Sequence, residues 1–321
     1  MARPDRPLVI QTEDLDPQAA AWLAERATLE VIAHDDPAFR ARLPEAEGLV
    51  VRTYTQVDAP LLAQAPRLKV VGRAGVALEN IDLDACRQRA VAVVHTPGAN
   101  TRAVVELVTL VMLDALRPRL ALDGPVEPAR WHELRRELTA PRQVSDLTLG
   151  ILGLGKIGTG MARVAQALDM RALYHDIRTI PADARHGAEE VDFDTLLAES
   201  DIFTIHIDAR PGNAKLINEK RLAQLKEDAL LINTARGFVM DPDALAAWLR
   251  HRPRARAIID VHDPHEPVGA AYPLLGLPNV RLMPHLGACT ARAKLNMSWV
   301  VRDVWRVLCG EAPEFPAKFA E

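Results

Sequence analysis

Two observations predict an α/β protein built from two doubly wound parallel sheets. Short apolar runs alternate with helical patterns along the whole of the 321-residue chain, and such alternation is typical of parallel sheets with helices on both faces. In the segment 147–176, LTLGILGLGKIGTGMARVAQALDMRALYHD, a glycine triplet stands between a strand pattern and a helix pattern. The length suits two domains of ordinary size.

The first hundred residues contain five strand patterns separated by four helical ones. Strands are predicted at Leu8–Gln11, Leu29–Ala33, Gly48–Val51, Leu68–Val71 and Val91–Val94, and helices at Asp16–Arg26, Pro37–Leu43, Asp58–Gln64 and Leu83–Arg89. Ligands of such sheets bind beyond the carboxyl ends of the strands. The segments 52–55 and 72–82, which follow the third and fourth strands, are therefore candidate binding loops.

A long helix is predicted over Thr101–Leu116. It is apolar nearly all round, so we expect it to be buried between domains. The segment 118–143 is rich in Pro, Arg and Glu and reads as an arm or linker rather than as core.

Strand patterns resume in the second half, and one amphipathic helix is predicted over Thr290–Leu308. The second-half strands are expected at Leu147–Leu152, Ala172–Tyr174, Ile202–Ile207, Ala229–Ile232, Ala257–Ile259 and Val280–Leu282, with helices at 157–168, Asp194–Ala198, Glu219–Gln224 and Asp241–Arg250. The last helix leaves too little chain for another domain, so we expect it to return to the first sheet. The predicted domains are residues 1–99 plus 289–321, and residues 100–288.

The glycine triplet has the context of a dinucleotide site. Gly153 permits a sharp turn, Gly155 lets the backbone approach a pyrophosphate, and Gly158 lets the helix pack close to the strand. Asp176 ends the next strand, where it can accept hydrogen bonds from ribose hydroxyls and repel a 2′-phosphate, so NAD is favoured over NADP. A phosphate-loop NTPase is excluded because that motif needs Ser or Thr where Ile157 stands.

Composition excludes several other classes of protein. The net charge is −4, which makes nucleic acid an unexpected partner. The three cysteines lie far apart and form neither a metal-ligand pattern nor a disulfide framework. The N-terminus lacks a signal-peptide core, and no apolar run has membrane-spanning length. We therefore expect a cytoplasmic protein with no membrane or nucleic-acid partner and no metal.

Three polar loops follow strands of the second half, at the same sheet edge as the glycine turn. They are 233–237 (NTARG), 260–267 (DVHDPHEP) and 284–287 (PHLG). These loops and four further segments, taken in their order along the chain, resemble the D-isomer-specific 2-hydroxy-acid dehydrogenase family over nearly the whole chain. The further segments are GLGKIG, IIDV, GRAGVALENID and NTRAVVE. The resemblance implies a Rossmann cofactor domain inserted in a flavodoxin-like substrate domain.

The resemblance also implies a catalytic trio. His285 would be the acid/base, because imidazole titrates near working pH. Glu266 would hydrogen-bond the other ring nitrogen and stabilise the protonated ring, and Arg236 would hold the substrate carboxylate and polarise the carbonyl. The family usually places its glutamate five residues after the aspartate of the IIDV segment, where this chain has His265. We assign the role to Glu266 by assuming a one-residue insertion, and His265 stays the alternative.

Further residues carry over from the family pattern. Those implied for NAD are Gly153, Gly155, Lys156, Ile157, Gly158, Asp176, His206, Thr234, Ala235, Arg236, Asp260, His285 and Gly287, with a satisfied structural histidine as the alternative for His206. Those implied for the substrate are Arg52, Arg73, Val76, Ala77, Asn100 and Arg236, with the backbone amides around Val76 and Ala77 binding its carboxylate. Ala77 and Glu79 stand where glycine and aspartate are usual.

The loops 52–55 and 72–82 most resemble those of 3-phosphoglycerate dehydrogenases, so the expected reaction is NAD-dependent hydride transfer to or from a D-2-hydroxy acid. Reduction of hydroxypyruvate or glyoxylate is the near alternative. The alternative of another class is an NAD-sensing, corepressor-like binding protein of the same fold with little turnover. The family usually forms homodimers, and the arm suits such an assembly.

Overall fold

The structure, a computed structural model, describes residues 6–263, 266 and 268–318. The chain divides into two compact units, Met1–Asn100 with Ala288–Glu321, and Thr101–Gly287. Each unit is built on its own parallel sheet, and each is described by itself. Among the described residues, no helix is long and apolar enough to cross a membrane.

The sheet of the first unit has five parallel strands in the order β2-β1-β3-β4-β5. This is the order of flavodoxin-like folds, as the sequence predicts. The strands are β1 (Leu8–Gln11), β2 (Thr28–Val31), β3 (Gly48–Val51), β4 (Val70–Arg73) and β5 (Ala92–Val94).

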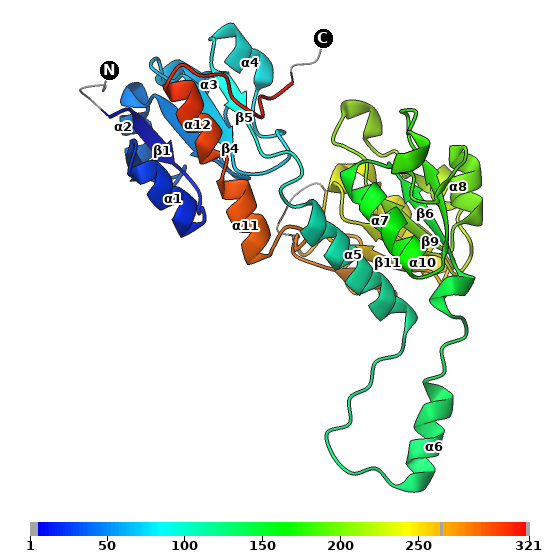
Figure 1. The fold of residues 1–321 in the computed structure, drawn as a ribbon. Helices are drawn as coiled ribbons and strands as arrows, with labels where there is room; N and C mark the ends of the chain where they lie inside the picture. Colours follow the sequence, from blue (N-terminus) through cyan, green and yellow to red (C-terminus); the bar gives the residue numbers. More distant parts are fainter. Residues whose placement is uncertain (1–5, 264–265, 267, 319–321) are drawn as a thin grey trace. The chain divides into compact units, whose positions relative to one another are not determined.

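Helices cover both faces of this sheet (Figure 1). They are α1 (Pro17–Ala24), α2 (Pro37–Arg42), α3 (Ala59–Gln64), α4 (Leu83–Gln88) and α12 (Val301–Leu308), and α11 (Ala291–Ser298) packs against α1. Asp16, Asp36, Asp58 and Asp82 begin the first four helices as N-caps, each accepting a hydrogen bond from a backbone N–H of the first turn. Such caps satisfy donors that a helix start leaves unpaired.

The two faces of the sheet have separate apolar cores. Side chains of α2, α3 and α4 form one cluster, and those of α1 and α12 form the other. Helix α12 lies so close to β4 that a Cβ added at Gly72 would stand 2.3 Å from Val304 Cγ2. The single helix predicted over Thr290–Leu308 is wrong in one respect: it is broken at Trp299 and Val300 into α11 and α12.

The sheet of the second unit has seven parallel strands in the order β12-β11-β10-β9-β6-β7-β8. Counted from β6, this is the Rossmann order with one further strand at the β12 edge, so the predicted fold class is confirmed. The strands are β6 (Thr148–Leu152), β7 (Arg171–His175), β8 (Glu189–Glu190), β9 (Ile202–Ile205), β10 (Leu230–Asn233), β11 (Arg256–Ile259) and β12 (Val280–Leu282).

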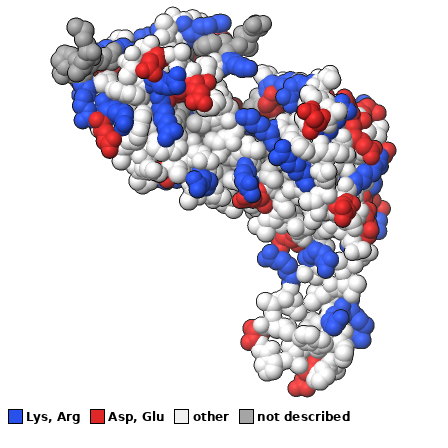
Figure 2. All heavy atoms as spheres, in the orientation of Figure 1, with Lys and Arg blue, Asp and Glu red and all other residues white. Residues whose placement is uncertain are grey.

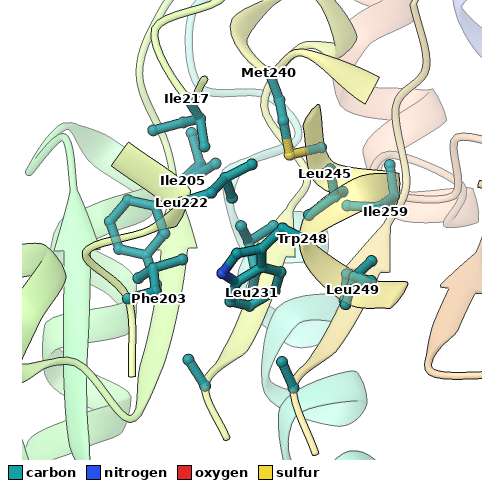
Figure 3. Close-up of a cluster of buried hydrophobic side chains, with 14 of the residues drawn as sticks. Phe203, Ile205, Ile217, Leu222, Leu231, Met240, Leu245, Trp248, Leu249 and Ile259 are labelled. Carbon is teal, nitrogen blue, oxygen red and sulfur yellow. The ribbon is translucent and has the colours of Figure 1, made fainter. Parts of the chain in front are cut away.

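Two layers of helices enclose this sheet. They are α5 (Thr101–Leu116) and α7 (Lys156–Ala167) on one face, and α8 (Phe193–Glu199), α9 (Glu219–Leu222) and α10 (Pro242–His251) on the other. Figure 3 shows the second layer, where Trp248 and Leu249 of α10 meet Leu231 and Ile259 of the sheet. Short 3-10 turns lie at Leu43–Glu45, Val144–Asp146, Ala182–Ala184, Pro211–Asn213 and Gly237–Val239.

Helix α5 is only partly buried, which corrects the expectation of burial all round. Its buried side chains face α7 and the sheet, whereas Leu110 is 58% exposed. The arm that follows projects away from the sheet of this unit and contains a helix, α6 (Pro128–Glu137), that has no buried residue (Figure 1). Figure 2 shows charges of both signs interspersed over the visible face.

Candidate active site

The glycine turn after β6 has the geometry expected of a phosphate-binding turn. Gly153 has a φ of +90°, which favours glycine, and a Cβ there would stand 3.0 Å from the His206 carbonyl oxygen. A Cβ at Gly158 would lie 2.1 Å from the Gly153 carbonyl oxygen, so only glycine lets α7 pack this close to the turn. Gly155 is the N-cap of α7 and offers no side chain to the first N–H groups. The first N–H groups of a helix have no partner within the helix and can bind an anion, which is the role predicted for the backbone of Lys156 and Ile157.

Asp176 follows β7 and faces the same turn. Its Oδ2 accepts a hydrogen bond from Leu154 N at 2.8 Å, and its carboxylate pairs with Arg178 through Nε at 3.1 Å and Nη2 at 3.0 Å. Burial alone would raise the pKa of Asp176, but the hydrogen bonds from Arg178 and Leu154 outweigh it, and the pKa is lowered. The group is therefore an ionised acceptor, as a ribose-binding acid must be.

Two buried polar side-chain atoms, one after β9 and one after β10, have no hydrogen-bond partner among the described residues. His206 Nε2 shares a hydrogen bond of 2.9 Å with Thr204 Oγ1, but within the described residues His206 Nδ1 has no partner, and neither does Thr234 Oγ1. Burial lowers the pKa of His206 to about 3, so its ring is neutral. Since buried polar atoms are nearly always hydrogen-bonded, these two atoms at adjacent strand ends fit a polar ligand such as NAD.

His285 and Glu266 form a hydrogen-bonded pair. His285 Nδ1 donates to Glu266 Oε2 at 2.7 Å, and Glu266 Oε1 accepts from the His262 backbone N–H at 3.1 Å. Burial alone would raise the pKa of Glu266, but the bond from His285 outweighs it and the pKa is lowered. With Nδ1 engaged by the carboxylate, Nε2 is the ring nitrogen that can serve a substrate. His265, the alternative partner, lies outside the described residues.

Asp260 holds the loop that carries His285. Its two carboxylate oxygens accept hydrogen bonds from Leu286 N at 2.7 Å and Gly287 N at 2.8 Å, and burial raises its pKa. His285 itself has a φ of +56°, a left-handed conformation that few non-glycine residues adopt. Strain of this kind persists where neighbouring contacts fix it. Asp260 thus fixes the backbone at His285, a contact that the sequence pattern alone did not suggest.

The Arg236 loop touches the loop of the glutamate. A Cβ at Gly237 would stand 2.2 Å from the carbonyl carbon and oxygen of His262, so the two loops are in backbone contact. The fully buried Asn233 shapes the turn, donating to the Arg236 carbonyl at 3.0 Å and accepting from Ala235 N at 3.0 Å. Sequence reasoning gave Asn233 no role, although its place at the end of a buried strand was a usable signal. The structure thus brings Arg236, Glu266 and His285 onto contiguous loops of one sheet edge.

In the first unit, the loops after β3 and β4 are joined by polar contacts. Glu13 accepts hydrogen bonds from all four backbone N–H groups of residues 52–55, at 2.8–3.2 Å. Asn80 Nδ2 donates to the carbonyls of Arg52 and Thr55, at 3.1 and 2.7 Å. Arg73 lies under Gly75, where a Cβ would stand 1.3 Å from Arg73 Nη1. The predicted substrate residues Arg52, Arg73, Val76 and Ala77 therefore share one edge of this sheet, and Glu13 was missed.

Comparison with known families decides the class. Residues 109–287 match the model of the D-isomer specific 2-hydroxyacid dehydrogenase, NAD binding domain. The chain belongs to this family.

Relatives agree with this membership. Over 262 residues, 81% of this chain, it is 36% identical to a D-3-phosphoglycerate dehydrogenase of Archaeoglobus fulgidus, and it spans about half of that protein, 49%. It is 37% identical to an (S)-sulfolactate dehydrogenase of Chromohalobacter salexigens, covering 92% of this chain and 96% of that protein. The solved structure of the TT0316 protein from Thermus thermophilus is 31% identical and matches with a TM-score of 0.83 over 97% of this chain and 100% of that one.

Family membership confirms the predictions of an NAD-dependent dehydrogenase class and of NAD as cofactor. The matched residues include the glycine turn, Asp176, and the loops of Arg236 and His285. The roles of individual residues in this member of the 2-hydroxyacid dehydrogenase family stay predictions.

Proposed function

We propose that the protein is an NAD-dependent oxidoreductase that transfers a hydride between nicotinamide and a D-2-hydroxy acid or its 2-keto acid. The His285–Glu266 hydrogen bond of 2.7 Å carries this proposal, because it engages Nδ1 and thereby assigns the acid/base role to His285 Nε2, beside the loops of an NAD-binding domain. NAD, when bound, supplies the hydride acceptor or donor. The unit 101–287 is the proposed cofactor domain and the other unit the proposed substrate domain.

The proposed proton path uses the chain's own groups. In the oxidation direction, His285 Nε2 accepts the substrate hydroxyl proton, and the Glu266 carboxylate at Nδ1 stabilises the resulting imidazolium. In the reduction direction the same nitrogen returns that proton. Arg236, with its planar guanidinium, binds the substrate carboxylate and polarises the carbonyl oxygen. Thr234, His206 and Asp176 are the proposed polar contacts to NAD.

The proposed substrate is 3-phosphoglycerate, with hydroxypyruvate or glyoxylate as the near alternative. Arg52 and Arg73 support the first, since they stand on the edge where a second anionic group would lie beyond the carboxylate. Two relatives described above are named for substrates with such a second anion, a phosphate and a sulfonate. An assay panel should therefore include 3-phosphoglycerate, sulfolactate, hydroxypyruvate and glyoxylate, each with the matching nicotinamide cofactor.

The decisive experiment couples this panel to His285→Ala. We expect measurable turnover by the wild type, a loss of at least a hundredfold in kcat for the variant, and unchanged NADH binding by fluorescence titration. Near-normal turnover by His285→Ala would refute the assigned acid/base. NAD binding with no turnover on any substrate would instead favour the corepressor-like alternative.

A homodimer is the proposed assembly. Of the large apolar side chains exposed among the described residues of the second unit, five lie on α5 and the arm and three elsewhere. The five are Leu110, Leu120, Leu122, Trp131 and Leu138. Helix α6 has no buried residue of its own, and an arm of this kind gains stability when a second copy covers it.

A further inference from the structure

In the loop 75–77, the carbonyl oxygens of Gly75 and Val76 are hydrogen-bonded to Thr96 and His95. The Gly75 carbonyl oxygen accepts two hydrogen bonds from Thr96, one from its backbone N–H at 3.0 Å and one from its hydroxyl at 3.1 Å. The Val76 carbonyl oxygen is 2.9 Å from His95 Nδ1. Because a carbonyl oxygen can only accept, that ring nitrogen carries the proton.

These anchors fix the direction of two N–H groups. The Gly75 carbonyl and the Val76 N–H belong to one planar peptide unit, and the Val76 carbonyl and the Ala77 N–H to the next. In a trans peptide the C=O and N–H point in opposite directions. Both N–H groups therefore point away from His95 and Thr96. Within the described part of the chain, neither N–H has a hydrogen-bond acceptor.

Hydrogen bonds between β5 and the C-terminal segment fix the backbone that carries His95 and Thr96. They follow β5 directly, and the C-terminal segment covers that edge strand: His95 N donates to the Phe315 carbonyl at 3.2 Å, and Ala317 N to the Val93 carbonyl at 2.8 Å. On the other side of the loop, the Arg73 guanidinium fills the space under Gly75. The peptide planes at 75–77 are thus held by residues that follow β5 on one side and by Arg73, at the end of β4, on the other.

We propose that His95 and Thr96 are positioning residues that aim the Val76 and Ala77 N–H groups at the carboxylate of a 2-keto or 2-hydroxy acid. This inference rests on the proposed function and assigns two residues to it that touch no substrate themselves. Two parallel N–H donors suit a carboxylate, and such charge-assisted bonds are the stronger ones. Losing an anchor lets a peptide plane rotate and misdirects one donor.

Paired variants separate positioning from mere structural support. Thr96→Val removes the hydroxyl without changing the shape of the side chain, whereas Thr96→Ser keeps it. His95→Phe removes the donor, and the adjoining cavity of about 400 Å³ leaves room for the larger ring, whereas His95→Asn keeps an N–H donor near the position of Nδ1. The 2-keto or 2-hydroxy acid of the assay panel that is turned over best is the substrate, and NADH binding and melting temperature are measured for every variant.

We expect KM for this acid to rise roughly five- to tenfold in Thr96→Val and His95→Phe, the effect of one misdirected hydrogen bond. The values of kcat and the Kd for NADH should stay within about twofold, because carboxylate binding is equally strong in ground and transition states. Thr96→Ser and His95→Asn should keep KM near the wild-type value.

The outcomes are distinguishable. A wild type that turns over no acid of the assay panel, in either direction, overturns the proposed function and this inference with it. A wild type that is active, with unchanged KM in both donor-removing variants, overturns this inference alone. Equal losses of kcat in all four variants also overturn it, since they indicate general damage. If His95→Phe fails to fold, the comparison of Thr96→Val with Thr96→Ser decides the result.

Discussion

Arg178 occupies the carboxylate that the ribose of NAD is expected to use. It pairs with Asp176 through two guanidinium nitrogens, and Asp176 is nearly buried whereas Arg178 is 59% exposed. Exposed ion pairs contribute little, at most about 1 kcal/mol. The Arg178–Asp176 ion pair is therefore weak enough to break when a ribose binds. Breaking it still costs free energy, and this cost lowers the affinity for NAD.

Arg178→Ala should tighten NADH binding about threefold, within the range that an exposed pair supplies, and should weaken binding of NADPH by removing a cation from the ribose site. Isothermal titration with both cofactors measures this. Arg210→Ala, which removes the neighbouring guanidinium paired with Asp208, is the matched control and should leave NADH affinity unchanged. Weaker NADH binding in Arg178→Ala would mean that Arg178 contacts the cofactor directly.

The sequence could place candidate site residues that follow strand ends, because a strand end fixes where its loop emerges. Asp176, Arg236 and His285 are of this kind. It could not decide between Glu266 and His265, since a loop without periodicity gives no register. It also missed Glu13, because the partners of that carboxylate lie about forty residues away in the chain, and such a contact leaves no local pattern.

At the scale of elements, helices with a capping aspartate were well predicted, as with Asp16 before α1 and Asp241 before α10. The wrong or missing helix predictions lie where the sequence has no such capping or breaking residue, or no buried face. No Pro or Gly marks the break at Trp299 and Val300, so the apolar pattern read as one helix. Helix α6 was missed because it has no buried face to impose a period.

The Glu13 carboxylate caps the whole loop 52–55, and this contact should make stability depend on pH. Burial alone would raise the pKa of Glu13, but the four backbone hydrogen bonds outweigh it and the pKa lies below its ordinary 4.5. A lowered pKa means that the contribution is present above about pH 4.5 and is lost as pH falls through the folded-state pKa.

Glu13→Gln should therefore cost about 1–2 kcal/mol at pH 7, where a charged acceptor is lost. The difference from wild type should shrink as the pH is lowered below 4.5. Melting curves at pH 7 and in the acid range measure it. Glu314→Gln, on the surface of the same unit, should change nothing at either pH, and a Glu13→Gln penalty that persists unchanged in acid would contradict the assigned charge.

Helices α5 and α7 approach closely at one glycine. A Cβ at Gly160 would stand 2.5 Å from Val105 Cγ2, and a valine in a helix has little freedom to rotate away. Gly160→Ala gains up to about 1 kcal/mol of helix propensity but overpacks the contact at a cost of about 1–3 kcal/mol, so a net loss of stability is expected.

Adding Val105→Ala to Gly160→Ala should restore part of this loss, which a double-mutant cycle of melting temperatures detects. Gly124→Ala, at a position with open space around the added Cβ, controls for the change of residue type. If Gly160→Ala raised the melting temperature by itself, the two helices would have to be further apart than the structure shows.

At the scale of the whole molecule, the fold class followed from alternation alone, because parallel strands need a crossover between them and helices are the usual crossovers. The sheet orders, flavodoxin-like and Rossmann, needed the family resemblance as well. The exposed side of α5 was not predicted, since an apolar helix surface has the same sequence pattern whether its own chain or a second copy covers it.

That exposed side leads to the prediction for the assembly. Leu110 and Trp131 are 58% and 45% exposed, and full burial of one such side chain against a partner contributes about 1.5–3 kcal/mol. A carboxylate placed in a buried interface costs at least as much. Leu110→Glu combined with Trp131→Glu should therefore convert a wild-type dimer into a monomer at micromolar concentration, as measured by sedimentation velocity. Leu275→Glu, an equally drastic change at another exposed leucine of the same unit, should leave the dimer intact. A wild type that sediments as a monomer would rule out the dimer, and a double variant that stays dimeric would place the interface elsewhere on the chain.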